Sequence, residues 1–196
     1  LTMVQRTAFT LIVLVALVTG ASAATWNVDA AHSSVNFAVK HLVISTVNGS
    51  FDEFSGSIDW DGKDLSTGKA DFTIQMGSVD TDNTGRDEHL VSDDFFNAAE
   101  FPTITFKSTK VIPGDGSSFQ LVGDMTMHGV TKSVTFDCEF NGTADFRGTV
   151  KAGFSAKTKI NRQDFGITWS KSLDGGGLVV SDEVKISLDL EFNQAS

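Results

Sequence analysis

The sequence has very few cysteines and prolines, and it has no tyrosine. Its 196 residues include one Cys, two Pro and no Tyr. A single cysteine excludes an intramolecular disulfide framework and a zinc site built from several thiolates. Basic residues are also scarce, 15 against 25 acidic ones, which gives a net charge of -10. This balance argues against nucleic-acid binding and against electrostatic docking on anionic membranes, since both need a basic surface.

Long hydrophobic runs are absent except near the N-terminus. There Arg6 precedes the apolar run 8–18, and Ala21-Ser22-Ala23 follows it. A basic residue, an apolar core of about a dozen residues and a small-residue site are typical of a secretory signal peptide. We therefore expect residues 1–23 to be a signal peptide that is cleaved near Ala23 or Ala24. The remaining residues, 24–196, would then form one domain in a bacterial periplasm.

The rest of the chain alternates apolar and polar residues with a period of two, as half-buried β-strands do. The clearest run places five apolar residues on one face and five polar residues on the other: Val184, Ile186, Leu188, Leu190 and Phe192 against Glu183, Lys185, Ser187, Asp189 and Glu191. About eight such runs follow one another, most of them joined by short turns such as Asp61-Gly62. No long helical pattern separates them, which excludes a parallel sheet and predicts an all-β antiparallel meander.

A sandwich and a closed barrel share this pattern. Eight strands in sequence order favour an up-and-down barrel, because closure removes the edge strands. Such a barrel either fills its interior with side chains or encloses one small ligand. A transmembrane barrel would turn its apolar face toward lipid and would need aromatic girdles. With no Tyr and only three Trp in the chain, we expect no stable membrane insertion.

The apolar face of these runs is rich in phenylalanine. We expect seven side chains on this face to point inward and line a tunnel: Phe37, Phe72, Ile74, Phe106, Met125, Phe136 and Phe154. Gly56, Ala70, Gly123 and Ala152 are small residues among these large ones. They either leave a cavity or interlock with neighbouring Phe rings, and the pattern does not decide between the two. Cys138 alternates with Phe residues, so we expect a buried, unreactive thiol.

The segment 81–101 interrupts the alternation. Its sequence favours two short helical turns, the second of them capped by Ser92. Phe95 and Phe96 are adjacent in this segment. We expect the segment to cover or flank the tunnel and to contribute both rings to its lining.

Motifs that carry catalysis or bind cofactors are not found. The four histidines are far apart, and none has the i, i+4 spacing of a helical zinc pair: His32, His41, His89 and His128. There is no Gly-x-Ser-x-Gly turn, P-loop or dinucleotide fingerprint. The residues therefore indicate neither a metal nor a cofactor, and they do not favour an enzyme.

Several motifs resemble those of one known family. They are Trp26-Asn27-Val28-Asp29, His32-Ser33-Ser34-Val35-Asn36-Phe37, Asp87-Glu88-His89-Leu90, Phe101-Pro102-Thr103-Ile104-Thr105-Phe106, Gly129-Val130-Thr131-Lys132 and Arg162-Gln163-Asp164-Phe165-Gly166. In this combination the chain resembles the YceI-like family of polyisoprenoid-binding proteins over roughly residues 25–192.

The resemblance implies an extended, lipocalin-like, eight-stranded antiparallel β-barrel with short helices in the central segment. It implies an apolar tunnel that holds a polyisoprenoid or another long-chain amphiphilic lipid. It also implies export to the periplasm, frequent homodimers, no catalysis and no cofactor besides the bound lipid. Two other functions stay open: an envelope stress or interaction protein that binds lipid incidentally, and an enzyme that acts on a lipid-like substrate.

Four polar residues belong to the two most distinctive motifs: Asp29, His32, Arg162 and Asp164. In one interpretation, at least one of them faces the lipid head group at the tunnel mouth, where Arg162 would bind a phosphate in a bidentate manner. In the other, they form a hydrogen-bonded plug that orients the strand ends.

Overall fold

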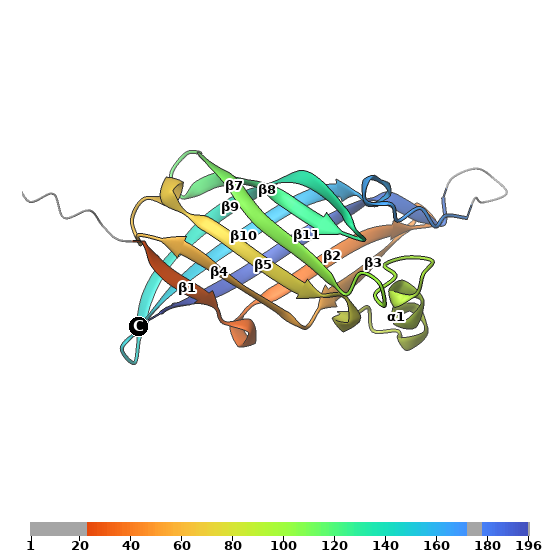
Figure 1. The fold of residues 1–196 in the computed structure, drawn as a ribbon, viewed down its shortest axis with the longest axis horizontal. Helices are drawn as coiled ribbons and strands as arrows, with labels where there is room; N and C mark the ends of the chain where they lie inside the picture. Colours follow the sequence, from red (N-terminus) through yellow and green to blue (C-terminus); the bar gives the residue numbers. More distant parts are fainter. Residues whose placement is uncertain (1–22, 172–177, 196) are drawn as a thin grey trace, which may run out of the picture.

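The computed structural model describes residues 23–171 and 178–195, which form a long barrel of β-strands (Figure 1). The predicted signal peptide lies outside the described residues, apart from Ala23. The strands are β1 (Ala24–Val28), β2 (Ser34–His41), β3 (Ser45–Phe51), β4 (Phe54–Trp60), β5 (Lys69–Gln75), β6 (Val79–Asp80), β7 (Thr103–Pro113), β8 (Ser118–Met127), β9 (Val130–Phe146), β10 (Thr149–Asn161) and β11 (Val180–Gln194). The helical elements are α1 (Thr84–Val91) and four 3₁₀ turns: η1 (Ala30–His32), η2 (Leu65–Thr67), η3 (Met76–Ser78) and η4 (Arg162–Phe165).

Eight of these strands close the barrel. Around the ring they run β1, β4, β5, β7, β8, β9, β10 and β11, and β11 pairs back with β1. Every pairing is antiparallel. The junction that closes the ring pairs Trp26 with Gln194 and Val28 with Phe192. The prediction of an eight-stranded antiparallel barrel is confirmed.

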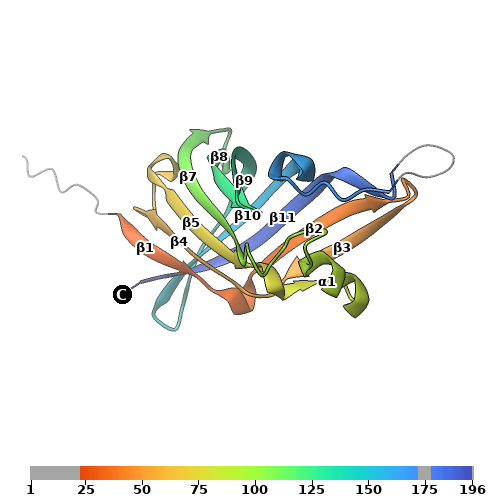
Figure 2. The ribbon, with the colours of Figure 1, turned by 45° about the vertical axis from the view of Figure 1, so that its right-hand side comes forward.

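Three further strands lengthen one side of the wall. They continue the sheet in the order β11, β2, β3, β6. β1 and β2 both pair with β11, and η1 separates them. The side chain of Asp29 caps this turn by accepting a hydrogen bond from the backbone N–H of Ala31. Figures 1 and 2 show the β2–β3 hairpin projecting beyond the ring at the end where α1 lies, so the wall is longest there.

The end of the barrel near β1 is filled by aromatic rings. Trp26 and Trp60 are each 2% exposed, and their ring centroids lie 5.4 Å apart. Phe140, Phe154 and Phe192 pack against them, with the Trp60–Phe154 and Phe154–Phe192 pairs in edge-on geometry. Edge-to-face aromatic pairs stabilise a core beyond the effect of their buried area. We call these five residues the end plug.

Small residues on the inner face interlock with phenylalanine rings. A Cβ atom added at Gly56 would lie 2.5 Å from the ring of Phe72, and one at Gly123 would lie 2.4 Å from the ring of Phe106. Each ring therefore lies over a glycine of the neighbouring strand. Ala152 is buried among the residues of the end plug. Of the two alternatives left open by the sequence, interlocking is the one observed at these positions.

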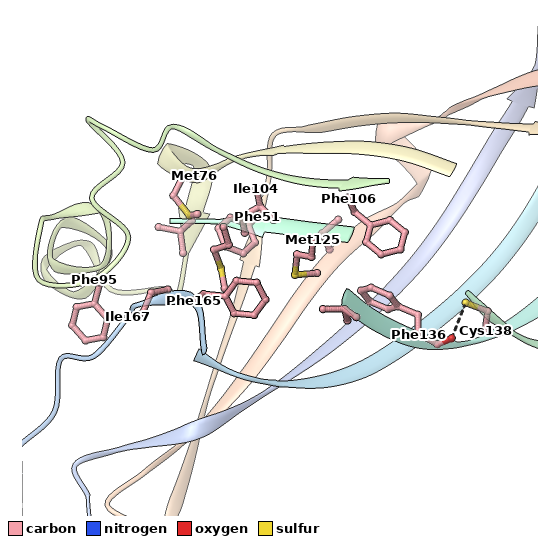
Figure 3. Close-up of a cluster of buried hydrophobic side chains, with 14 residues drawn as sticks. Phe51, Met76, Phe95, Ile104, Phe106, Met125, Phe136, Cys138, Phe165 and Ile167 are labelled. Carbon is pink, nitrogen blue, oxygen red and sulfur yellow. Dashed lines mark hydrogen bonds between the residues drawn. The ribbon is translucent and has the colours of Figure 1, made fainter. Parts of the chain in front are cut away.

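A second cluster of apolar side chains occupies the half of the barrel near α1 (Figure 3). It joins inward-facing strand residues such as Phe51, Ile104 and Met125 to Phe95, which follows α1 in the chain. The two clusters together show that the apolar face of the strands points inward, as their alternation predicted.

The single α-helix of the described residues is α1, at the start of the segment between β6 and β7. Its N-cap is Asn83, whose side chain accepts a hydrogen bond from the N–H of Arg86. Ser92 is the C-cap, and its hydroxyl donates to the carbonyl of His89. A hydrogen-bonded turn does follow, since the N–H of Phe95 donates to the carbonyl of Ser92. The expected capping of this turn by the Ser92 side chain is wrong, because its hydroxyl is used to end α1. No helix in residues 23–171 or 178–195 has the length and apolar character needed to cross a bilayer.

Candidate functional site: an apolar cavity inside the barrel

A cavity runs along the inside of the barrel. Its volume is about 220 Å³, and its wall is almost entirely apolar. All nine residues predicted to line a tunnel form part of this wall: Phe37, Phe72, Ile74, Phe95, Phe96, Phe106, Met125, Phe136 and Phe154. Their contact with a ligand stays a prediction. A cavity lined in this way offers water few hydrogen-bond partners and favours apolar ligands.

The end plug bounds the cavity on one side. Trp60, Phe154 and Phe192 belong both to the plug and to the cavity wall. Since these rings are packed together, a ligand that enters the barrel cannot pass through them without displacing the core. The plug thus occupies part of this end, and Leu65, Gly68 and Lys69 continue the cavity wall beside it.

The segment between β6 and β7 covers the other half of the barrel. Leu90, Phe95 and Phe96 contribute to the wall there. Ring contacts hold the segment against the barrel: the centroid of Phe96 lies 6.2 Å from that of Phe51, and Phe95 lies 5.0 Å from Trp169. This placement agrees with the expectation that the segment covers or flanks the tunnel, whereas its effect on ligand binding stays a prediction.

Arg162 is buried at this covered end and lines the cavity. Its Nε donates to the carbonyl of Ser181, its Nη1 to the carbonyl of Ile167, and its Nη2 to Asp182 Oδ1 at 3.0 Å. Burial lowers the pKa of Arg162, and the neighbouring Asp182 opposes this effect. These bonds join η4 to β11. They agree with the interpretation in which Arg162 orients strand ends through hydrogen bonds. Asp164, by contrast, is exposed on η4 and lies outside the cavity wall.

Asp29 and His32 belong to a separate polar cluster. Lys151 Nζ lies 3.0 Å from Asp29 Oδ2 and 2.6 Å from Glu191 Oε1, and His32 Nδ1 lies 3.1 Å from Asp29 Oδ2. The hydrogen bond from Lys151, followed by that from His32, holds the pKa of Asp29 well below its usual range. The bond to Glu191, followed by that to Asp29, raises the pKa of Lys151. Neither Asp29 nor His32 lines the cavity.

The same cluster has the composition of a cation site. Ligand atoms of Asp29, His32 and Glu191 lie within 4.8 Å of one another. The ammonium group of Lys151 already bonds to both carboxylates, so a divalent ion would have to displace it. This arrangement favours an ion-pair network that ties η1 to β10 and β11.

The four polar residues predicted for a tunnel mouth therefore do not come together. Lys151, the partner of Asp29, lies near the start of β10, whereas Arg162 follows the last residue of that strand. At the rise of an extended strand, the two clusters are about 35 Å apart. A single lipid head group cannot contact both, and only Arg162 among the four lines the cavity.

The sequence matches a known protein family. A family model described as a YceI-like domain matches residues 26–192. The chain belongs to the YceI-like family. A UPF0312 protein of Staphylococcus aureus (strain MSSA476) is 41% identical over 167 residues, which are 84% of this chain and 95% of that relative.

Solved structures share the same barrel. Burkholderia cenocepacia BcnA is 27% identical with a TM-score of 0.71, covering 84% of this chain and 98% of its own. A YceI protein of Campylobacter jejuni is 36% identical with a TM-score of 0.69, covering 80% and 90%. A polyisoprenoid binding domain from Saccharophagus degradans is 18% identical with a TM-score of 0.65, covering 88% and 99%, and this likeness concerns the fold alone.

The cavity wall also contains residues that the sequence analysis did not predict as tunnel lining. Ile186, Leu188 and Leu190 of β11 line the cavity although they were not assigned to it. Their strict alternation with polar residues was the signal that could have placed them there. Cys138 also lines the cavity and is buried, as predicted, and burial raises the pKa of its thiol to about 12.

Proposed function

We propose that this protein binds a polyisoprenoid or similar long-chain amphiphilic lipid in its barrel cavity and carries it without changing it chemically. The observation that supports this proposal is the cavity wall, which is almost entirely apolar and extends from the end plug to the segment after α1. Carriage within the periplasm is part of the proposal, because the predicted signal peptide lies outside the described residues. The homodimer that the resemblance implies also stays a prediction.

Burial of a hydrocarbon tail supplies enough free energy for such binding. Each buried methylene contributes about 0.8 kcal/mol, so ten of them contribute about 8 kcal/mol. Ordering of the tail and loss of translational freedom remove several kcal/mol of this. Apolar contacts distinguish poorly between tails of different structure but strongly favour longer ones. Affinity should therefore depend more on tail length than on branching.

The class of ligand has support from a protein of the same fold. The Saccharophagus degradans protein is described as a polyisoprenoid binding domain. An isoprenoid chain is long, flexible and apolar, as the shape and lining of this cavity require. We extend that ligand class to this chain as part of the proposal.

The polar end of the lipid would lie near Arg162. This side chain forms part of the cavity wall at the end covered by the α1 segment. Among the described residues its N–H groups make three hydrogen bonds, fewer than the five that a guanidinium group offers. A phosphate or hydroxyl group at this end could accept the remaining bonds, with the tail directed toward the end plug.

A pair of adjacent residues on β11 provides the test. Leu188 lines the cavity, whereas its neighbour Ser187 is exposed on the outer face of the barrel. The affinities of wild type, Leu188→Gln and Ser187→Gln would be measured for polyprenols of increasing length, by displacement of a fluorescent fatty acid. An unpaired amide in an apolar wall costs about 1–3 kcal/mol. Leu188→Gln should therefore bind about tenfold or more weakly, and Ser187→Gln should bind as wild type does.

The proposal fails if wild-type affinity is independent of chain length. It also fails if both variants bind equally well while remaining folded, because the cavity wall would then not contact the ligand. Circular dichroism and urea unfolding of each variant separate loss of the fold from loss of binding.

A further inference from the structure

Among the described residues, the three large hydrophobic side chains with the highest exposed fractions lie at opposite ends of the barrel. Val43 and Ile44 are 71% and 84% exposed in the turn that joins β2 to β3. Phe146 is 57% exposed and is the last residue of β9, at the turn that leads to β10 and beside the C-terminal end of β11. Only the first of these turns lies at the end where the α1 segment covers the cavity (Figures 1 and 2). We call residues Leu42–Ile44 the β2–β3 turn.

The backbone of the β2–β3 turn is unusual for its sequence. Leu42 and Val43 have φ angles of 52° and 65°, in the left-handed region. Turn positions with a positive φ favour Gly and Asn, whereas a β-branched residue such as Val strongly disfavours them. Turn chemistry therefore does not explain why apolar residues occupy these positions.

A strip of valines in the cavity wall leads toward the turn. Val39 of β2 and Val180 and Val184 of β11 all form part of the cavity wall, and Val39 pairs directly with Val184. The N–H of Leu42 donates to the carbonyl of Val179, which ties the turn to the start of β11. The apolar cavity wall thus ends close to the exposed turn, with Lys40 and His41 between Val39 and Leu42.

The charges beside the turn differ from those of the whole chain. Residues 38–48 contain Lys40 and no acidic residue, although the net charge of the chain is -10. Lys171 lies close by, because its carbonyl accepts a hydrogen bond from the N–H of Val179. Asp182 and Glu183 of β11 also lie near the turn, but each is paired, with Arg162 and Lys159 respectively. An apolar tip with Lys40 and Lys171 nearby suits the interface of a phospholipid bilayer, where side chains enter the acyl region and ammonium groups meet phosphates.

The exposed area decides between a bilayer and a second copy of this chain. A stable protein interface buries about 800 Å² on each partner. Two side chains at the tip of a hairpin fall far short of that area. Shallow insertion into lipid needs no complementary surface, because each buried side chain contributes independently.

We propose that the β2–β3 turn inserts shallowly and reversibly into a phospholipid bilayer and thereby places the adjacent end of the cavity at the membrane surface. A lipid could then pass along the valine strip between the bilayer and the barrel without exposing its tail to water. This inference rests on the proposed function, and it adds the surface through which the cavity is filled and emptied.

The test compares the two ends of the barrel. The variant is Val43→Asn combined with Ile44→Ser, since Asn tolerates a positive φ better than Val does. The matched control is Phe146→Ser, which removes an exposed hydrophobic side chain from the opposite end. Each protein is sedimented with vesicles of phosphatidylcholine containing a minor share of phosphatidylglycerol. Transfer of a fluorescent polyprenol between such vesicles is measured in parallel, as is binding of a short, water-soluble prenol.

The double variant should partition onto vesicles about tenfold more weakly than wild type and transfer the polyprenol correspondingly more slowly. Its affinity for the short soluble prenol should be unchanged, and Phe146→Ser should behave as wild type in every assay. Equal partitioning of wild type and the double variant, or an equal loss in Phe146→Ser, would overturn the inference. A change of oligomeric state in the double variant, seen by light scattering, would assign the turn to contact with a second copy instead.

The short prenol separates this inference from the proposed function. If wild type fails to bind any prenol, the proposed function is wrong. If it binds them and the double variant transfers them at the wild-type rate, only the role of the turn is wrong. Should the double variant be unfolded by circular dichroism, Ile44→Ser alone carries the same comparison with a smaller expected change.

Discussion

Replacement of Gly56 by alanine should both destabilise the barrel and weaken lipid binding. Gly56 on β4 pairs directly with Phe72 on β5. The added methyl group would lie 2.5 Å from Cδ1 and 2.6 Å from Cε1 of the Phe72 ring, whereas ordinary contacts begin at 3.4 Å. The ring must therefore move by roughly 1 Å to restore ordinary van der Waals contact. Since Phe72 lines the cavity, such a movement can narrow it.

The two expected effects have separable magnitudes. Overpacking of a core costs about 1–3 kcal/mol, and the lower conformational entropy of alanine in the unfolded chain offsets about 0.5–1 kcal/mol of this. The net loss in the free energy of unfolding should thus be about 1–2 kcal/mol, measured by urea denaturation. A shifted ring that excludes one or two methylenes of the tail would lower affinity by about tenfold, as measured with the fluorescent fatty acid.

Gly153→Ala on β10 is the matched control for this experiment. The nearest atom to its added methyl group is Cβ of Asn141 at 3.5 Å, which is ordinary contact. Stability and affinity should both stay close to wild type. If Gly56→Ala were less stable but bound the longest polyprenol with wild-type affinity, Phe72 would not bound the ligand site. If it were as stable as wild type, the interlocking of Gly56 with Phe72 would be wrong.

Three further predictions concern Asp29, Cys138 and Phe96. Because Lys151 and His32 lower the pKa of Asp29 in the folded state, its contribution is present above about pH 4 and is lost as the pH falls through the folded-state pKa. The deficit of Asp29→Asn in urea unfolding, about 1 kcal/mol at neutral pH, should therefore shrink in acid, and a constant deficit would contradict the ion-pair account. With its pKa raised to about 12, Cys138 should resist thiol reagents at pH 8 until the protein is unfolded, and fast labelling of the native state would show that it is exposed. Phe96→Ala removes the ring contact with Phe51, worth about 1 kcal/mol, so stopped-flow measurements should show bound lipid leaving about fivefold faster, and an unchanged rate would mean that this segment does not retain the ligand.

The alternation of residues predicted the antiparallel strands and their inner face, and the sequential order of the eight runs favoured a barrel over a sandwich. Side chains such as Phe37, Phe106 and Phe136 line the cavity because a period of two leaves each strand residue only two sides to face. The same rule could have added Leu188, which lies in the most regular run of the chain. The lengthened wall was not predicted, because the turn η1 that separates β1 from β2 has no strong punctuation in the sequence.

The polar clusters depended on register, which the sequence does not specify. Asp29 meets Lys151 and Glu191, which are 122 and 162 positions further along the chain, through the pairing of β10 and β11 around the closed ring. Arg162 belongs to the other distinctive motif and lies at the opposite end of β10 from Lys151. Motif membership therefore grouped residues that the strand geometry separates. Only the distances of the folded chain show that they serve different clusters.

Native mass spectrometry of the protein isolated without detergent from the cells that make it tests the central claim most directly. The account predicts one non-covalently bound lipid with a long apolar tail for each barrel. The mass of this lipid should be the same before it binds and after it is released. Leu188→Gln should carry less of this lipid than Ser187→Gln, because only the first change alters the cavity wall. Protein that stays free of lipid even after loading with polyprenols, or that releases a hydrolysed or oxidised product, would contradict the account.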